Sequence, residues 1–444
     1  MTEKLIDHRP PAQAALVLFP HRARGHDLRA PEARLDEAMG LALALDLEVR
    51  QGEIIPLRAT TPATLFGKGK VAEIGEMATA LDVDVIVVDD ALTPVQQRNL
   101  EKAWQVKVID RTGLILEIFA RRARTREGKL QVELARLAYE RSRLVRTWTH
   151  LERQRGGFGV MGGPGETQIE TDRRLLAGKI GRLKKELEEV RRTRTLQRAA
   201  RKRTPFPTIA LVGYTNAGKS TLFNRLTDSK VEARDMLFAT LDPTLRTVKL
   251  PNGRPAILSD TVGFISDLPH ELIEAFRATL EEVESADVIV HVRDISNPDT
   301  AAQAADVMEV LAQIGVDPEG PRTIVEVWNK LDLLDEEERG AAKARALRGE
   351  QAGVGPVAVS AQTGEGIERL QDVLAALIDQ GGAVEADLAP GDGRALAWLY
   401  RHGRIVDRLD DPDGRVRLSV RLDPQALGQF EQMFPEALAG YAAE

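Results

Sequence analysis

One stretch constrains the fold of this chain more than any other, the run TIALVGYTNAGKSTLFNRL at residues 208–226. Its first residues are apolar and partly β-branched, which predicts a short strand. Gly213-x4-Gly218-Lys219-Ser220 follows, and then an amphipathic helical pattern. Glycines in such a loop let backbone N–H groups curl around a phosphate, while the helix N-terminus adds its dipole. The run therefore predicts a phosphate-binding loop in an α/β domain with a doubly wound sheet.

The side chains of this loop predict how a nucleoside triphosphate is held. Lys219 is expected to neutralise the β- and γ-phosphates, and the Ser220 hydroxyl is expected to ligate Mg²⁺. We expect nucleotide contacts from the whole loop, that is, from Gly213, Tyr214, Thr215, Asn216, Ala217, Gly218, Lys219, Ser220 and Thr221.

Two segments downstream have the pattern of switch elements. ILSDTVGF (257–264) is a strand pattern ending in Asp260-x-x-Gly263, which suits Mg²⁺ binding through water and γ-phosphate sensing by the Gly263 amide. FATLDPT (238–244) lies between the two motifs, and its Thr240 is the candidate that closes over Mg²⁺. The expected metal site is Ser220, Thr240 and Asp260, and the expected catalytic residues are Lys219, Thr240 and Gly263. Nucleotide contacts are expected from Phe238, Ala239, Thr240, Leu241, Asp242, Asp260, Thr261, Val262 and Gly263.

Two further motifs predict selection of guanine. TIVEVWNKLDL (323–333) ends in Asn329, Lys330, Leu331 and Asp332. The Asp332 carboxylate can accept both N1–H and the 2-amino group of guanine, a pair of donors that adenine lacks, so GTP is favoured over ATP. Ser360 and Ala361 in VAVSAQTGEG supply a turn whose amide can recognise guanine O6. Five motifs in this order predict an Mg²⁺-dependent GTPase with GTP as its substrate.

A second glycine-rich stretch, RQRGGFGVMGGPGETQIETDRR at residues 153–174, contains the pattern G-x-G-x-x-G at 157–162. That pattern binds dinucleotides only between a strand and a helix, and here a basic helix precedes it. A Rossmann-type oxidoreductase therefore depends on this match alone. Six glycines between Gly156 and Gly165 are costly to order, which favours close backbone approach to a partner over a simple turn.

Heptad patterns on both sides of this stretch predict an antiparallel coiled-coil hairpin with the glycines at its tip. The seam positions are Leu130, Leu134, Leu137, Leu144, Trp148 and Leu151 on one side, with Arg141 interrupting, and Leu176, Ile180, Leu183, Leu187 and Val190 on the other. Residues 121–203 contain 24 Lys or Arg against 10 Asp or Glu, whereas the rest of the chain carries 37 against 58. A basic rod in an acidic protein indicates a polyanionic partner, with a solvated helical linker as the alternative.

The remaining residues predict two smaller units. Alternating strand and helix patterns before residue 125 indicate an α/β domain, with strands at 14–19, 84–89 and 106–110. Residues 394–434 indicate a strand hairpin through Asp413-Gly414 and then a helix, attached by the linker GGAVEADLAPGDG. The expected domains are an N-terminal α/β domain at 1–125, a basic coiled-coil hairpin at 126–204, a GTPase domain at 205–380 and a small α+β domain at 388–444.

The composition limits the cellular compartments in which such a protein is expected. Cysteine is absent, so disulfides and thiolate metal sites are excluded, and no apolar run approaches the length of a membrane span. Nothing at the N-terminus has the pattern of an export signal. We expect a monomer in the cytoplasm, with a weak peripheral membrane fraction as a further option.

The five motifs resemble those of translation-factor-type GTPases. RGGFGVMGGPGETQIETDRR, preceded by an α/β domain and basic helices, resembles the HflX family of ribosome-associated GTPases over residues of about 10 to 375. The resemblance implies binding to the large (50S) ribosomal subunit, with the tip near the rRNA of the peptidyl-transferase region, and separation of ribosomal subunits. Phe264 stands where Ras-type enzymes carry a water-orienting glutamine, so unaided hydrolysis is expected to be slow and the missing group to come from elsewhere in the chain, a bound ion or the ribosome. An RNA-binding assembly factor that uses GTP with negligible turnover is the alternative.

Overall fold

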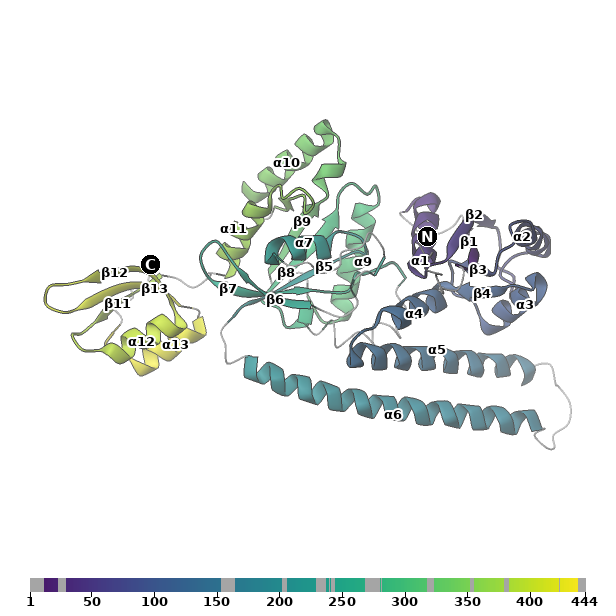
Figure 1. The fold of residues 1–444 in the computed structure, drawn as a ribbon, viewed down its shortest axis with the longest axis horizontal. Coiled ribbons are helices and arrows are strands. Elements are labelled where there is room, and N and C mark those ends of the chain that lie inside the picture. The colour runs from purple at the N-terminus through teal and green to yellow at the C-terminus, as the bar shows by residue number, and fades with distance from the viewer. Residues whose placement is uncertain are drawn as a thin grey trace, which may run out of the picture.

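A computed structural model shows sheets and helices arranged along one long axis, with a two-helix hairpin beside them (Figure 1). The structure describes residues 12–22, 29–152, 164–201, 206–228, 237–238, 240, 244–267, 280, 282–317, 323–351, 355–378, 383–422 and 424–437. The glycine-rich tip at 153–163, and Ala239, Leu241 and Asp242 of the predicted switch, lie outside these ranges.

The N-terminal residues form a parallel sheet of order β2-β1-β3-β4 with helices packed against it. Its elements are β1 (Ala14–Arg22), α1 (Pro31–Ala44), β2 (Glu48–Leu57), α2 (Lys68–Ala80), β3 (Val85–Val88), α3 (Pro94–Trp104), β4 (Lys107–Asp110) and α4 (Arg111–Arg122). β1 and β3 are buried over nearly their whole length, which explains the apolar runs that predicted them. β2 was not predicted, because it is an edge strand with polar residues and only Ile55 fully buried.

Two long helices, α5 (Arg126–Glu152) and α6 (Pro164–Arg201), run side by side as the predicted hairpin (Figure 1). Their shared apolar contact contains residues from both predicted seams. The residues of this contact are Leu130, Leu134, Leu137, Leu176, Ile180, Leu183, Leu187 and Val190. The side chains of Leu144, Trp148 and Leu151 lie outside the described part of the structure.

The central sheet has the order β10-β9-β8-β5-β7-β6, with β6 antiparallel to β7 and the other neighbours parallel. Alternate residues of β5 face opposite sides: Ala210 and Val212 pack toward α9, and Ile209 and Leu211 pack toward α7 and α11. The predicted doubly wound sheet is confirmed. Its elements are β5 (Thr208–Gly213), α7 (Lys219–Thr227), β6 (Thr244–Lys249), β7 (Pro255–Asp260), β8 (Val288–Asp294), α9 (Thr300–Gln313), β9 (Thr323–Asn329), the 3-10 turn η1 (Leu331–Leu333), α10 (Glu336–Gln351), β10 (Val357–Ala358) and α11 (Ile367–Ile378).

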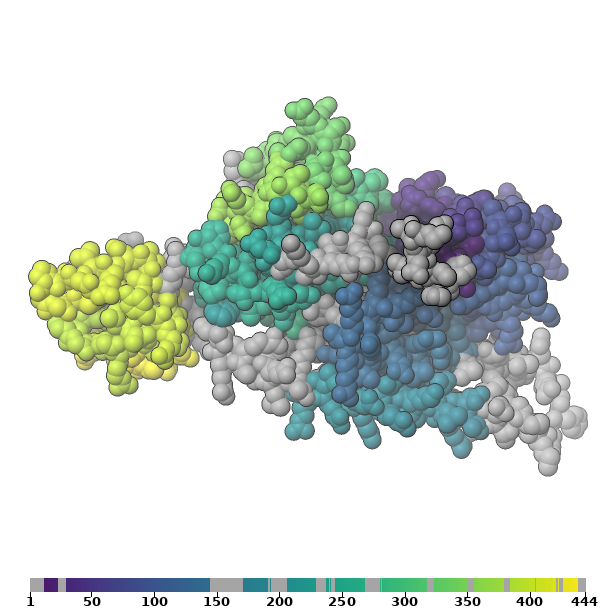
Figure 2. All heavy atoms as spheres, viewed as in Figure 1, coloured from purple at the N-terminus to yellow at the C-terminus, as the bar shows by residue number. Residues whose placement is uncertain are grey.

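The C-terminal residues form a separate lobe (Figure 2) with an antiparallel sheet of order β11-β13-β12. The hairpin through Gly414 and the final helix are present as predicted. The linker prediction was wrong, because part of that segment is strand β11 and pairs with β13 along its whole length. The elements are β11 (Ala383–Leu388), α12 (Gly393–His402), β12 (Arg404–Asp410), β13 (Val416–Arg421) and α13 (Pro424–Met433).

The N-terminal and central sheets share one apolar core. Phe119 of α4 and Val17 of β1 belong to the same buried cluster as Val212 of β5, Phe238 and Phe264. A continuous core fixes the two units against each other more firmly than a polar contact between separate domains. The N-terminal unit therefore packs directly against the part of the central sheet that carries the predicted phosphate loop and switches.

Candidate functional site

The predicted phosphate loop joins the carboxyl end of β5 to the first turn of α7, the position where open α/β sheets bind ligands. Gly218 has φ +90°, and a Cβ there would lie 2.2 Å from Asn329 Nδ2, so only glycine fits. Lys219 is buried and turns back over the loop, donating to the carbonyls of Gly213 (3.0 Å) and Tyr214 (2.8 Å). Burial lowers the pKa of Lys219 to about 8, although the Asp260 carboxylate opposes that shift.

The three residues predicted to hold a metal lie together. Ser220 Oγ is 2.7 Å from Thr240 Oγ1 and donates to Asp260 Oδ2 at 2.7 Å, and Thr240 Oγ1 donates to the same Oδ2 at 2.9 Å. Burial raises the pKa of Asp260, and the hydrogen bonds from Ser220 and the charge of Lys219 act against that rise. The second oxygen of Asp260, Oδ1, is buried and has no hydrogen-bond partner among the described residues.

Gly263 lies directly beside the phosphate loop. A Cβ on it would come within 2.9 Å of Thr215 Cα and 3.0 Å of Lys219 Nζ, so any side chain would displace one of them. The next residue, Phe264, is 1% exposed, and its backbone is bonded to the loop: its N–H donates to Gly213 O (3.1 Å) and its carbonyl accepts from Thr215 N (2.7 Å). Its side chain therefore packs in the core and has no polar atom with which to orient water.

The predicted guanine-binding residues meet at the ends of β9 and β10. Asn329 donates to Ala217 O (2.8 Å) and accepts from Ala361 N (2.9 Å), so it ties the phosphate loop to the Ser360-Ala361 turn. Ser360 Oγ donates to Asp332 Oδ1 at 2.5 Å and thereby orients that carboxylate. Lys330 pairs with Asp294 at the end of β8 (2.8 Å), a partner that no sequence motif indicated.

Several residues predicted to contact nucleotide have their side chains turned elsewhere. Thr261 Oγ1 donates to Leu211 O (2.6 Å), Val262 and Leu331 are buried, and Phe238 packs against Phe119. From these four positions only backbone groups remain for a nucleotide.

Tyr214 of the phosphate loop is bonded to the N-terminal unit. Its hydroxyl donates to Glu37 of α1 and accepts from Ser266 N (2.9 Å) and from Arg29 (2.9 Å). Arg111 of α4 completes the contact, donating to Glu37 (2.6 Å) and to Ser266 O (2.9 Å). We call Arg29, Glu37, Arg111, Tyr214 and Ser266 the interface network.

The charges of the interface network compensate one another. Burial alone raises the pKa of Glu37, but the Arg111 guanidinium and the Tyr214 hydroxyl outweigh it and hold that pKa below its usual range. Burial likewise lowers the pKa of Arg111, and the carboxylates of Asp89 (2.5 Å) and Glu37 more than reverse that effect. Glu37 and Arg111 are therefore charged in the fold, beside the predicted switch.

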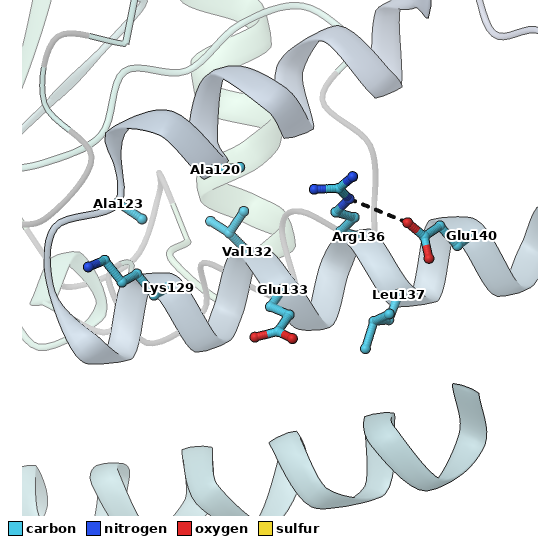
Figure 3. Close-up of a pocket in the computed structure, with 8 residues that line it drawn as sticks. All are labelled: Ala120, Ala123, Lys129, Val132, Glu133, Arg136, Leu137 and Glu140. Carbon is cyan, nitrogen blue, oxygen red and sulfur yellow. Dashed lines mark hydrogen bonds and ion pairs between the residues drawn. The ribbon is translucent and has the colours of Figure 1, made fainter. Parts of the chain in front are cut away.

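A cavity of about 310 Å³ lies between the end of α4 and the first turns of α5, away from the phosphate loop (Figure 3). Its charged lining residues include both signs, and Arg136 is paired with Glu140 at 3.3 Å. No side chain of a predicted site lines the cavity, so we assign it no ligand.

The fold and the five clustered motifs define a P-loop GTPase. Sequence profiles of known families match the chain in order: "GTP-binding GTPase N-terminal" at residues 32–120, "GTP-binding GTPase Middle Region" at 122–201, "50S ribosome-binding GTPase" at 208–330 and "HflX C-terminal domain" at 346–436.

Two similar curated relatives are also GTPases of one family. "GTPase HflX" of Magnetococcus marinus is 50% identical over 430 residues, which cover 96% of each chain. "GTPase HflX" of Escherichia coli K12 is 45% identical over 389 residues, covering 87% of this chain and 89% of that one. The chain therefore belongs to the HflX family of GTPases. A crystal structure of SsGBP with GDP is similar over 83% of this chain and 99% of that one, with 24% identity and a TM-score of 0.48.

Across the described residues, none of the helices combines the length and the apolar character needed to span a bilayer.

Proposed function

We propose that this GTPase binds the large ribosomal subunit in its GTP form, separates ribosomal subunits, and is released on hydrolysis. The observation that carries the proposal is the cluster of Ser220, Thr240 and Asp260 beside Lys219, because it joins the phosphate loop to both switch motifs. A loop that reaches this cluster only when the γ-phosphate is bound would let GTP and GDP states differ in shape.

The same cluster fits Mg²⁺. Two hydroxyls and a carboxylate are hard oxygen donors of the kind that Mg²⁺ binds, and the unpartnered, buried Asp260 Oδ1 is free to accept from a metal-bound water. We propose that Ser220 and Thr240 hold the ion and that Asp260 holds it through water. Bound Mg²⁺ neutralises charge on the β- and γ-phosphates, while Lys219 and the Gly263 amide hold those phosphates in place.

At the other end we propose that Asp332 selects guanine, that Ala361 N–H shares its hydrogen bond to Asn329 Oδ1 with guanine O6, and that Lys330 covers the base. The hydrogen bond from Ser360 supports this, because it holds Asp332 Oδ1 and so limits rotation of the carboxylate that would accept from the base. The Lys330–Asp294 pair holds the lysine stem at the same edge.

Two features support a ribosomal partner. The central sheet matches a family described as "50S ribosome-binding GTPase", and the hairpin region is strongly basic, with 24 Lys or Arg against 10 Asp or Glu over residues 121–203. Basic helices of this kind bind the phosphates of rRNA. We propose that the hairpin tip approaches the rRNA of the peptidyl-transferase region, and that the free protein is a cytoplasmic monomer.

The decisive measurement is the GTPase rate with and without purified large subunits, combined with sedimentation of whole ribosomes. Unaided hydrolysis should be slow because Phe264 cannot orient water, and large subunits should accelerate it. Subunit separation should require GTP. Binding without acceleration or separation would favour the second candidate, an RNA-binding assembly factor that uses GTP as an ordering ligand, which the apolar Phe264 also suits.

The basic hairpin gives a second test of the ribosomal partner. Reversing Arg191, Arg192 and Arg194 to Glu should weaken pelleting with large subunits and reduce the slope of log affinity against log salt by about 0.7 to 0.9 for each lost phosphate contact. The matched control reverses Arg98, Lys102 and Lys107, exposed cations of the N-terminal unit, and should change neither. Equal behaviour of the two triple variants would make the hairpin charge a solvated surface.

The glycine-rich tip gives a third test. Replacing Gly157, Gly159 and Gly162 with alanine should leave GTP affinity intact, because the phosphate loop lies elsewhere, and should impair subunit separation. NAD binding that the same variant loses would instead support a dinucleotide site at the tip. Normal separation by the folded variant would remove the tip from the mechanism.

A further inference from the structure

Residues just before Thr240 are packed into the N-terminal unit. The ring of Phe238 is 2% exposed and meets the ring of Phe119 edge-on, with centroids 4.6 Å apart and an interplanar angle of 79°. The backbone of Phe238 has φ +56°, a left-handed conformation that bulky side chains seldom adopt without support from their surroundings. Contacts outside this segment must therefore hold it in place.

Arg122, the last residue of α4, supplies such contacts. One guanidinium nitrogen donates to the carbonyls of both Leu237 and Phe238, each at 2.6 Å, and the other donates to Ala44 O at the end of α1 (3.1 Å). Hydrogen bonds from a charged donor are stronger than those between neutral groups. Leu237 also packs against α1, where a Cβ on Gly40 would lie 3.2 Å from its Cδ1.

Thr240 is only two residues beyond Phe238, so the position of one restricts the reach of the other. In this arrangement Thr240 Oγ1 lies within 2.9 Å of both Ser220 Oγ and Asp260 Oδ2. The same segment is thus fixed at both ends, by the N-terminal unit at Leu237 and Phe238 and by the proposed metal site at Thr240.

We propose that Phe119 and Arg122 are positioning residues for GTP: they anchor the switch at Phe238 so that Thr240 closes over the metal and the γ-phosphate. The inference rests on the proposed role of Thr240. It adds that helix α4, which lies outside the GTPase motifs, discriminates between GTP and GDP. Because coupling is reciprocal, GTP should also tighten the contact between the N-terminal unit and the switch.

The test compares affinities of the full-length protein for GDP and for the non-hydrolysable analogue GMPPNP, both with Mg²⁺. Arg122→Ala should weaken GMPPNP binding about tenfold, the scale of one or two charge-assisted hydrogen bonds, and leave GDP binding within about twofold. Phe238→Ala, which removes the aromatic contact from the switch side, should act in the same direction. Arg121→Ala is the matched control, since Arg121 donates to Leu45 O (2.7 Å) within the N-terminal unit.

A Thr240→Ala variant separates failure of the inference from failure of the proposed site. If Thr240→Ala weakens GMPPNP selectively and Arg122→Ala does not, or if Arg122→Ala weakens GDP and GMPPNP equally, the anchor is overturned. If Thr240→Ala itself does not discriminate, the proposed role of Thr240 is wrong and the anchor falls with it. In the double variant, Arg122→Ala should add no further loss, because it acts through Thr240; additive losses would also overturn the inference.

Discussion

The two ends of the proposed nucleotide site are held in different ways. At the guanine end, Asn329, Asp332 and Ser360 are fixed by hydrogen bonds that stay within the central sheet and its loops. At the phosphate end, Tyr214 and Phe238 are fixed by α1 and α4, which precede the phosphate loop by about 90 residues or more. The proposed base selection thus depends on one unit, whereas the proposed discrimination between GTP and GDP depends on two.

The largest expected effect is a loss of folding stability, from a substitution in the interface network at the phosphate end. Glu37→Ala removes one buried partner from each of Arg111 and Tyr214 and should cost about 3–5 kcal/mol of stability, the usual loss when one member of a buried ion pair is removed. Urea unfolding at pH 7 measures it. Asp36→Ala, at the exposed neighbouring position on α1, should stay within about 0.5 kcal/mol. If Glu37→Ala lost no more stability than the Asp36→Ala control, the interface network would not be a stabilising contact.

The sequence predicted the guanine end better than the phosphate end, and the reason is physical. Asn329 and Ser360 act through loops at strand ends, so short motifs contain most of their contacts. The Glu37–Tyr214 bond joins residues 177 positions apart, and nothing in the local pattern around Glu37 distinguishes it from other charges of α1.

The same reason explains the missed elements. β2 and β11 are edge strands, and each pairs with a single strand, β1 or β13, that is separated from it by at least one helix. An edge strand is less buried than a central one, so its apolar sequence pattern is weak. The segment after Asp110 has a strong apolar pattern, and it forms helix α4. Its contact with the switch could not be predicted, because Phe119 packs against Phe238, which lies 119 residues later in the chain. The motif spacing correctly predicted that Ser220, Thr240 and Asp260 lie together. It did not predict which contacts hold Thr240 in that position.

The next effect breaks the guanine end alone. Asp332→Asn places a donor where guanine also presents donors, so two charge-assisted hydrogen bonds are lost and GTP affinity should fall by about 3 kcal/mol, more than 100-fold. XTP should become the preferred nucleotide. Competition binding of GTP and XTP measures the change. Asp335→Asn is the control, because Asp335 caps α10 through Glu338 N (2.8 Å) and faces no base. Unchanged GTP preference would remove Asp332 from the base site.

Lowering the pH tests strand β8, which pairs with β5 at the phosphate end and carries Asp294 at the guanine end. His291 lies on β8, and burial lowers its pKa to about 4, with Arg293 and Lys219 acting in the same direction and Glu326 against. A histidine kept neutral in the fold contributes stability above pH 6.5, where the unfolded chain is also neutral, and loses that contribution as pH falls toward 4. Wild type should lose about 2 kcal/mol between pH 7 and pH 5 through this group.

His291→Gln should lose correspondingly less over the same interval, as followed by urea unfolding at each pH. Since β8 pairs with β5 and ends at Asp294, the partner of Lys330, protonation of the folded chain near pH 4 should weaken GDP and GMPPNP binding in parallel. A change confined to GMPPNP would mean that acid acts on the switch rather than on the shared strand.

The smallest effect sharpens the comparison. Ser360→Ala removes the hydroxyl that orients Asp332 and accepts from Thr363 N (3.1 Å), so GTP affinity should fall by about 1 kcal/mol, roughly fivefold. GDP affinity should fall by the same factor, because both nucleotides carry guanine. Ser285→Ala, whose hydroxyl donates to Glu282 O at a remote turn, is the control. The ratio of GMPPNP to GDP affinity should stay constant in Ser360→Ala and change in Arg122→Ala. A changed ratio in Ser360→Ala would show that the two ends are coupled through the phosphate loop, where Asn329 holds Ala217.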